Sequence, residues 1–415
     1  MSIGNVLARP RADRFLANLG WLGSAQLVNR VFRLATTVVL ARLLSPTDYG
    51  LAAIVLTTNE FVTVFTRSGV GQQLIKADEA DLLVLADTAY WLNWILCGGL
   101  FLIQCAVGLV MGLFYGNQIP APICAMACIY LVLPFALVQT TLIARENRLK
   151  VYAVITAVQL STDCVLTIIF ALLGWGMWAV ILPKVLVCPI WVYFNLKECS
   201  WRPPKQFTLV NWRQIANFGR HVLGVELLTT LRANVDNLLV AQFLGVQALG
   251  IYFFAFNAGL GISMSILGAF STAIYPFLCE VGNDRVQMNA RFVRSLRTAA
   301  MVTIPLILLQ SGGAPFYVPI VFGQKWVTSG AVPVLILICL SALPRPFAEA
   351  ASQLLRARNL PHLDLTWNLV FTAILILALL VGSTGGILGV AIAVFATHAV
   401  CLPLYTFWAY RRAFA

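Results

Sequence analysis

Twelve long apolar stretches, separated by short polar or Gly/Pro turns, dominate this sequence of 415 residues. Each crossing of a bilayer's hydrocarbon core, about 30 Å thick, needs about 20 apolar residues in a helix. Since 60% of the chain is apolar and only 11% is charged, a soluble globular fold is excluded. We therefore predict an all-α polytopic membrane protein with about twelve transmembrane helices. The predicted helices cover residues 15–44, 47–68, 82–114, 119–143, 150–173, 175–198, 213–244, 246–280, 291–312, 329–357, 361–382 and 385–409.

Basic residues are distributed unevenly between the two sides of these helices. If the N-terminus is cytoplasmic, nineteen of the 28 Lys and Arg residues fall at the inner ends and loops, whereas the outer connections are almost bare apart from Lys325. Cytoplasmic loops of membrane proteins carry such an excess of basic residues. We predict cytoplasmic N- and C-termini, and we attribute the net charge of +12 mainly to topology and not to nucleic-acid binding.

A weak internal repeat lies at an offset of 200 residues, where segment 40–51 aligns with segment 240–251. Six helices per half return the chain to its starting side, so the halves are predicted to be parallel repeats about an axis along the membrane normal. The polar linker 198–212 contains Pro203 and Pro204. We predict two six-helix bundles, 1–204 and 205–415, around a central cavity. The matching positions are Ala41 and Ala241, Leu44 and Leu244, and Gly50 and Gly250.

Ionisable side chains inside membrane spans are costly and usually face a cavity or a partner. Arg30 and Arg33 share one helix face, and their helix carries no acid after Asp13. Because the planar guanidinium matches phosphate oxygens, this pair favours an anionic ligand, with Glu60 as the alternative partner. The predicted cavity cations for a diphosphate or sugar are Arg30, Arg33, Lys184, Arg232 and Arg345. The predicted charge partners or ion-coupling acids are Glu60, Asp163, Glu226, Asp236 and Glu349.

Several of these charges could instead neutralise one another. Arg232 and Asp236 are four residues apart, as are Arg345 and Glu349, so each pair can form an ion pair along its helix. Lys184 could pair with Asp163 or extend to the membrane interface. Glu60 and Glu226 have no basic residue three or four positions away, so coupling to H⁺ or Na⁺ stays open.

No chemistry-bearing motif accompanies these charges. The ten cysteines lie almost wholly in apolar stretches without metal-ligand spacing, and the three histidines are scattered. We therefore expect no metal site, no cofactor and no catalytic residue.

Five segments, in order along the chain, carry a resemblance to a known family. They are RVFRLATTVVLARLLSPTDYGLAAIV at 30–55, LIARENRLK at 142–150, NVDNLLVAQFLGVQALGIYFFAFN at 234–257, IYPFL at 274–278 and VFGQKW at 321–326. Together they resemble the polysaccharide transporter family, the Wzx-like oligosaccharide flippases of the multidrug/oligosaccharidyl-lipid/polysaccharide exporter superfamily. Many members of that family carry fourteen helices, two more than are predicted here.

The resemblance implies a flippase for undecaprenyl-diphosphate-linked oligosaccharide, working by alternating access in the bacterial inner membrane. Helices 1, 2, 7 and 8 would line its cavity. Such proteins serve O-antigen, capsule or exopolysaccharide assembly, so the implied partners are membrane lipids, the polysaccharide polymerase and the chain-length machinery.

Two other functions compete with this interpretation. A multidrug or other lipid exporter could use the same scaffold, because a fold does not dictate its substrate. A membrane-embedded polysaccharide polymerase or glycosyltransferase is the weaker alternative. Such an enzyme needs convergent polar groups, yet the longest outer connection, about 313–328, contains one basic residue and neither an acid nor a histidine.

Overall fold

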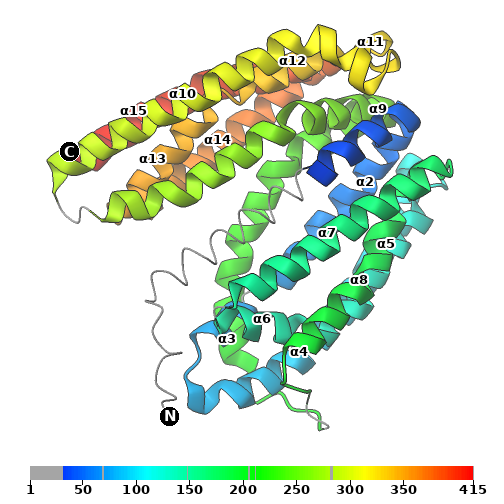
Figure 1. Ribbon diagram of the computed structural model, residues 1–415, viewed down its shortest axis with the longest axis vertical. Helices are drawn as coiled ribbons and strands as arrows, with labels where there is room; N and C mark the ends of the chain where they lie inside the picture. The colour runs from blue at the N-terminus through cyan, green and yellow to red at the C-terminus, as the bar shows by residue number, and fades with distance from the viewer. Residues whose placement is uncertain are drawn as a thin grey trace, which may run out of the picture. The chain divides into compact units, whose positions relative to one another are not determined.

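The computed structural model describes residues 31–67, 70–146, 148–203, 206–210, 212–280 and 284–414. Helices account for nearly all of this part of the chain, and it contains no β-strand (Figure 1). The predicted all-α membrane architecture is therefore confirmed. Arg30 and the earlier part of the first predicted helix lie outside the described residues; residues 31–43 of that helix are helical.

Contacts divide the chain into two compact units. Unit 1 comprises the residues up to Leu44 together with Val55–Ala233, and unit 2 comprises Ser45–Ile54 and Asn234–Ala415. This division follows contacts and not the repeat, so it differs from the boundary at 204–205. That repeat boundary stays a prediction.

Unit 1 is a bundle in which α4 packs on α5, α7 on α8, and α5 on α8. A short helix, α3, packs on α6. The chain bends by 53° between the segment 120–135 and α6, because Pro134 lies in a 3₁₀ turn that interrupts the predicted helix 119–143. The elements are the second part of α2 (Pro46–Thr63), whose residues 46–54 belong to unit 2, and η1 (Val64–Arg67), α3 (Val70–Lys76), α4 (Glu79–Tyr115), α5 (Pro120–Val132), η2 (Leu133–Phe135), α6 (Leu137–Arg145), α7 (Leu149–Leu172), α8 (Trp178–Glu198) and the first part of α9 (Trp212–Cys279).

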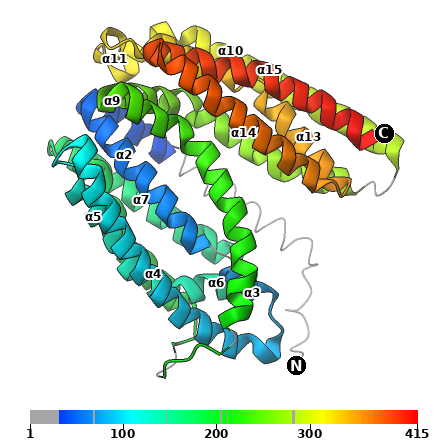
Figure 2. The same ribbon diagram turned by 180° about the vertical axis from the view of Figure 1, so that it is seen from behind.

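Unit 2 is a second bundle, in which α15 packs against α12, α13 and α14, and α10 packs against α12 and α13. Figure 2 shows α14 and α15 side by side along their length. Besides the later part of α9, its elements are α10 (Arg285–Tyr317), the π-helical turn η3 (Val318–Phe322), α11 (Lys325–Thr328), α12 (Ala331–Ser341), α13 (Arg345–Ala357), α14 (Pro361–Ser383) and α15 (Gly386–Phe414).

Among the described residues, nine helices are long and apolar enough to cross a membrane, or ten if α5 and α6 form one bent span. The number is smaller than twelve for two reasons. The first predicted helix is only partly described, and one candidate span, Glu226–Gly261, covers parts of two predicted helices. Those two helices meet at Gly245, whose non-helical backbone (φ 83°, ψ 176°) interrupts α9 where the sequence predicts a boundary. Glycine reaches this positive φ readily because it has no Cβ.

The turn before α2 is stabilised by Ser45 and Asp48. The Asp48 carboxylate accepts hydrogen bonds from the Ser45 backbone N–H (3.1 Å) and hydroxyl (2.7 Å), while the Ser45 hydroxyl accepts one from the Asp48 N–H (3.1 Å). These bonds form a capping box that fixes the start of the helix. The SPTD sequence in the predicted turn therefore sets the first residue of α2.

The two segments of the 200-residue repeat contact each other inside unit 2, where the start of α2 crosses α9. A Cβ on Gly50 would collide with the Val246 carbonyl oxygen, and a Cβ on Gly250 would collide with the Pro46 carbonyl oxygen. Each contact becomes the other when residue numbers shift by 200. Such reciprocity is the mark of a local two-fold relation, and small residues let helix backbones approach this closely.

We expect Gly250→Ala to destabilise unit 2, because the methyl group would meet a backbone oxygen that no rotamer change can move. Overpacking of this kind costs about 1–3 kcal/mol or more. The melting temperature of the purified protein in detergent measures the loss. Gly312→Ala is the matched control, since a Cβ there meets no atom within 4 Å. An equal melting temperature for both variants would contradict the close crossing.

Candidate functional site

One intramembrane ion pair lies in unit 1. Lys184 of α8 places its Nζ 3.2 Å from Oδ2 of Asp163 on α7, and the two side chains are 35% and 17% exposed. From the sequence, Lys184 could either pair with Asp163 or extend to the membrane interface, and the structure shows the pair. The second carboxylate oxygen, Asp163 Oδ1, is buried and makes no hydrogen bond within the described part of the chain. The charge of Lys184 is thus largely neutralised within its own bundle.

Arg33 differs from Lys184. It lies on the helical segment 31–43 with an exposed side chain, and it makes no ion pair with any described residue. Its backbone carbonyl oxygen accepts a hydrogen bond from Thr37 Oγ1 at 2.8 Å. This bond involves the main chain of Arg33 and not its guanidinium. Its predicted companion, Arg30, lies outside the described residues.

The remaining predicted residues of unit 1 lie on α2 and on the first part of α9. Glu60 is exposed near the end of α2, while Glu226 and Arg232 are half-buried on the first part of α9. Glu226 and Arg232 are six residues apart and so point to different sides of the helix. Arg232 belongs to unit 1 and Asp236 to unit 2, and their pairing along the helix stays a prediction.

Unit 2 contains a polar network between its apolar helices. Asp236 Oδ2 accepts a short hydrogen bond, 2.6 Å, from the hydroxyl of Tyr252. Asp236 lies before the Gly245 break in α9 and Tyr252 lies after it, so the break brings the two side chains together. The charge of Asp236 also interacts with Arg345 of α13. Two residues from the predicted site list are therefore electrostatically linked in this unit.

His398 of α15 extends the network. Its Nε2 lies 3.3 Å from Nη2 of Arg345, and its Nδ1 lies 2.8 Å from the Val394 carbonyl oxygen. A carbonyl only accepts and a guanidinium only donates, so this geometry fits the neutral imidazole with its proton on Nδ1. Protonation of Nε2 would remove the acceptor and place two cations together.

Glu349, predicted to pair with Arg345, accepts a hydrogen bond from Gln353 Nε2 at 2.8 Å. Its pairing with Arg345 stays a prediction. Sequence reasoning missed Gln353, Tyr252 and His398. Tyr252 lies 16 residues from Asp236, and His398 lies 53 residues from Arg345. The one feature of the sequence that could have drawn attention to this network is the position of His398 within an apolar span.

These arrangements suit binding and charge compensation. The described part of the chain contains no group of three or more His, Cys, Asp or Glu side chains that could hold a metal ion. The structure offers, in unit 1, a cation (Arg33) that makes no ion pair with the described residues, and in unit 2 a mixed-charge network. An anionic ligand can be held by the first, and a change of protonation can rearrange the second.

The family model and two relatives that are similar to this chain carry descriptions that refer to polysaccharide biosynthesis. The model of a family described as polysaccharide biosynthesis protein matches residues 39–331. The lipopolysaccharide biosynthesis protein WzxC of Escherichia coli is 22% identical, over 92% of this chain and 77% of its own length. The teichuronic acid biosynthesis protein TuaB of Bacillus subtilis is 23% identical, over 86% of this chain and 74% of its own length.

Two solved structures share the fold. The lipid II flippase MurJ, in an inward closed conformation, has a TM-score of 0.73 at 13% identity, covering 95% of this chain and 88% of its own. An inward-facing multidrug resistance transporter of the MATE family has a TM-score of 0.69 at 14% identity, covering 93% and 94%. At this level of identity the similarity shows the fold alone.

Proposed function

Since the chain belongs to the polysaccharide biosynthesis protein family, we propose that it translocates undecaprenyl-diphosphate-linked oligosaccharide across the bacterial inner membrane. The relatives named for lipopolysaccharide and teichuronic acid biosynthesis support a surface polysaccharide precursor as the cargo. A fold shared with a lipid II flippase supports movement of a lipid-linked sugar. The protein acts as a transporter and makes or breaks no covalent bond, and it serves O-antigen, capsule or exopolysaccharide assembly.

Arg33 is the observation that supports this function most directly. Its guanidinium is exposed and has no anionic partner among the described residues, whereas Lys184 is paired with Asp163. A diphosphate supplies the negative charge that an arginine binds through two parallel hydrogen bonds. Arg30 lies three residues earlier in the sequence, a spacing that predicts a shared helix face and a second cation for the same group.

Transport against a concentration gradient requires an energy source, and the unit 2 network supports proton coupling. In the neutral state His398 accepts a hydrogen bond from Arg345, and Arg345 interacts with Asp236. A proton on His398 or Asp236 changes the balance of charge around Arg345. Such a change is the kind of local electrostatic event that biases a two-state transporter.

Charge reversal at Arg30 and Arg33 is expected to lower polysaccharide export strongly. We expect the double variant Arg30→Glu and Arg33→Glu to lower transport on the order of 100-fold, because two charge-assisted contacts to the diphosphate become repulsions. The measurement is the restoration of surface polysaccharide in a bacterial strain that lacks its own flippase.

Arg213→Glu controls for net charge, because Arg213 is exposed at the start of α9 and lies at a predicted loop. Membrane abundance of every variant is measured by immunoblot. If the double variant is present at normal abundance and still exports polysaccharide, Arg30 and Arg33 are not part of the binding site. Failure of the unmodified protein in every flippase-deficient strain, together with drug resistance in a sensitive strain, would support a multidrug exporter instead.

A further inference from the structure

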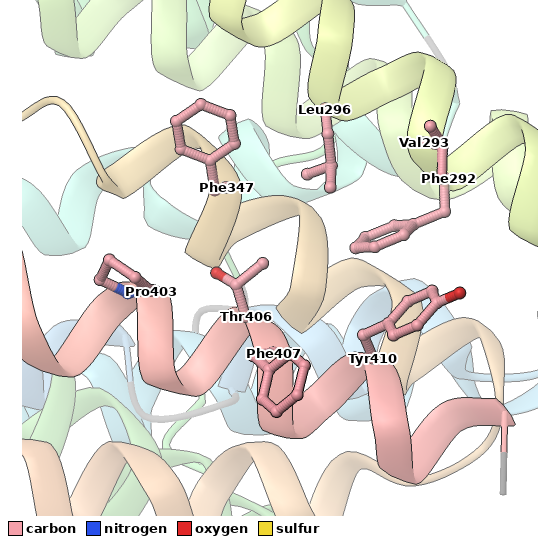
Figure 3. Close-up of a pocket in the computed structure, with 8 residues that line it drawn as sticks. All are labelled: Phe292, Val293, Leu296, Phe347, Pro403, Thr406, Phe407 and Tyr410. Carbon is pink, nitrogen blue, oxygen red and sulfur yellow. The ribbon is translucent and has the colours of Figure 1, made fainter.

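An apolar groove of about 400 Å³ opens on the surface of unit 2, and nothing in the proposed transport cycle uses it. Its walls come from α10, α13 and α15 (Figure 3). The volume lies within the range of about 300–1,000 Å³ that is typical of ligand sites. The residues that line it are Phe292, Val293, Leu296, Phe347, Pro403, Thr406, Phe407 and Tyr410.

The inside of the groove suits a hydrocarbon chain. Phe292 is buried and stacks on Tyr410, with ring centroids 5.9 Å apart, which gives the groove a defined aromatic wall. The Thr406 hydroxyl already donates to the Leu402 carbonyl oxygen at 2.9 Å. The mouth is accessible from outside, because Val293 is 44% exposed and Phe407 is 55% exposed.

The rim of the groove is cationic. The guanidinium of Arg411 lies 4.4 Å from the centre of the Phe407 ring. Arg297 lies one helical turn after the lining residue Val293 on α10, so it borders the same face, and its side chain is exposed. Neither Arg411 nor Arg297 makes an ion pair with any residue that the structure describes.

The helices that carry this rim supply no compensating charge. Neither α10 nor α15 contains an aspartate or a glutamate. Arg291 shows the contrasting case: its Nη1 lies 2.7 Å from Glu280 Oε2, so its charge is already neutralised. The rim therefore combines two cations with an apolar groove that opens on the surface of unit 2.

We propose that this groove binds an anionic phospholipid. One acyl chain lies between α10 and α15, and the head-group phosphate accepts hydrogen bonds from Arg411 and Arg297. Arginine suits phosphate because its planar donors match two oxygens at once. Basic pockets between transmembrane helices recognise anionic lipid head groups in this way.

The rim chemistry favours a phospholipid over a lipid-linked sugar. Sugar hydroxyls need acceptors as well as donors, and the two rim arginines offer donors only. A phosphate diester needs nothing more than the cations present. A bound phospholipid would connect the basic ends of α10 and α15 and so stabilise unit 2.

Native mass spectrometry of the purified full-length protein tests the proposal. The protein, delipidated in detergent, is titrated with phosphatidylglycerol or with the zwitterionic phosphatidylcholine of the same acyl chains. We expect one tightly bound phosphatidylglycerol and about tenfold weaker binding of phosphatidylcholine. Arg297→Gln combined with Arg411→Gln is expected to abolish this preference, while Arg213→Gln in unit 1 leaves it unchanged.

A second variant fills the groove without touching the charges. Val293→Trp adds bulk at the exposed mouth, and Met301→Trp is its control because Met301 is 69% exposed on the same helix outside the groove. We expect only Val293→Trp to lose the bound phosphatidylglycerol. Circular dichroism and gel filtration check that each variant is folded.

Three results would overturn the proposal. One is equal binding of the two lipids to the unmodified protein. Another is unchanged phosphatidylglycerol binding after Val293→Trp. The third is preferential displacement of phosphatidylglycerol by undecaprenyl diphosphate, which would make the groove a site for the cargo's lipid. None of these results depends on whether the transport proposal holds.

Discussion

Replacing Asp364 with alanine is expected to lower the free energy of unfolding by about 3–5 kcal/mol, because it leaves buried donors without their acceptor. Asp364, at the start of α14, is only 5% exposed. Its Oδ1 accepts bonds from Tyr405 of α15 (2.6 Å) and Asn368 (3.0 Å). Its Oδ2 accepts bonds from Ser352 (2.8 Å) and Arg356 (3.2 Å) of α13. One carboxylate thus joins three helices of unit 2.

The measurement is the melting temperature of the purified protein in detergent. Glu280→Ala is the matched control, because Glu280 also pairs with an arginine in unit 2, but its side chain is 66% exposed. Exposed ion pairs contribute no more than about 1 kcal/mol. If Asp364→Ala melts at the same temperature as Glu280→Ala, the buried network does not stabilise the bundle as described.

Trp326→Ala is expected to have an effect of similar size, about 3–5 kcal/mol, because it opens a large cavity in a packed core. Trp326 is fully buried and stacks on Phe254, with ring centroids 3.8 Å apart. Tyr49 meets the Trp326 ring edge-on at 5.3 Å. Phe322 packs against Phe254 at 5.3 Å. The indole therefore holds the first turns of α2 onto α9 beside the Gly50–Gly250 crossing.

Phe316→Ala provides the control, since Phe316 is an aromatic residue of unit 2 that is 74% exposed. We expect Phe316→Ala to leave the melting temperature almost unchanged, and Trp326→Phe to recover part of the loss. A Trp326→Ala protein as stable as the Phe316→Ala protein would show that the aromatic cluster is not part of the core.

The sequence predicts the helices well because each one needs only a long apolar stretch and a polar turn. Gly245 is placed correctly as a break, since glycine tolerates the positive φ found there. The offset of 200 residues corresponds to a real contact, because Gly50 and Gly250 occupy equivalent positions in the crossing. Lys184 and Asp163 could be paired from sequence as one of several alternatives, since they lie on consecutive helices.

The polar networks of unit 2 were beyond sequence reasoning. His398 and Arg345 are 53 residues apart, and Asp364 and Tyr405 are 41 residues apart, with no spacing rule that connects them. Asp364 also begins a helix, where an acid is expected for reasons of the helix dipole alone. Only packing of α13, α14 and α15 shows that its carboxylate is buried and shared.

Translocation of a lipid-linked sugar by the purified protein tests the central proposal most directly. Proteoliposomes are prepared with fluorescent undecaprenyl-diphosphate-linked oligosaccharide in both leaflets, and a membrane-impermeant glycosidase is added outside. We predict that the protein makes the inner-leaflet pool accessible to the enzyme, whereas protein-free vesicles and the Arg30→Glu, Arg33→Glu variant leave that pool protected. An inner pool that stays protected with folded, unmodified protein, under an imposed H⁺ or Na⁺ gradient as well as without one, would contradict the account.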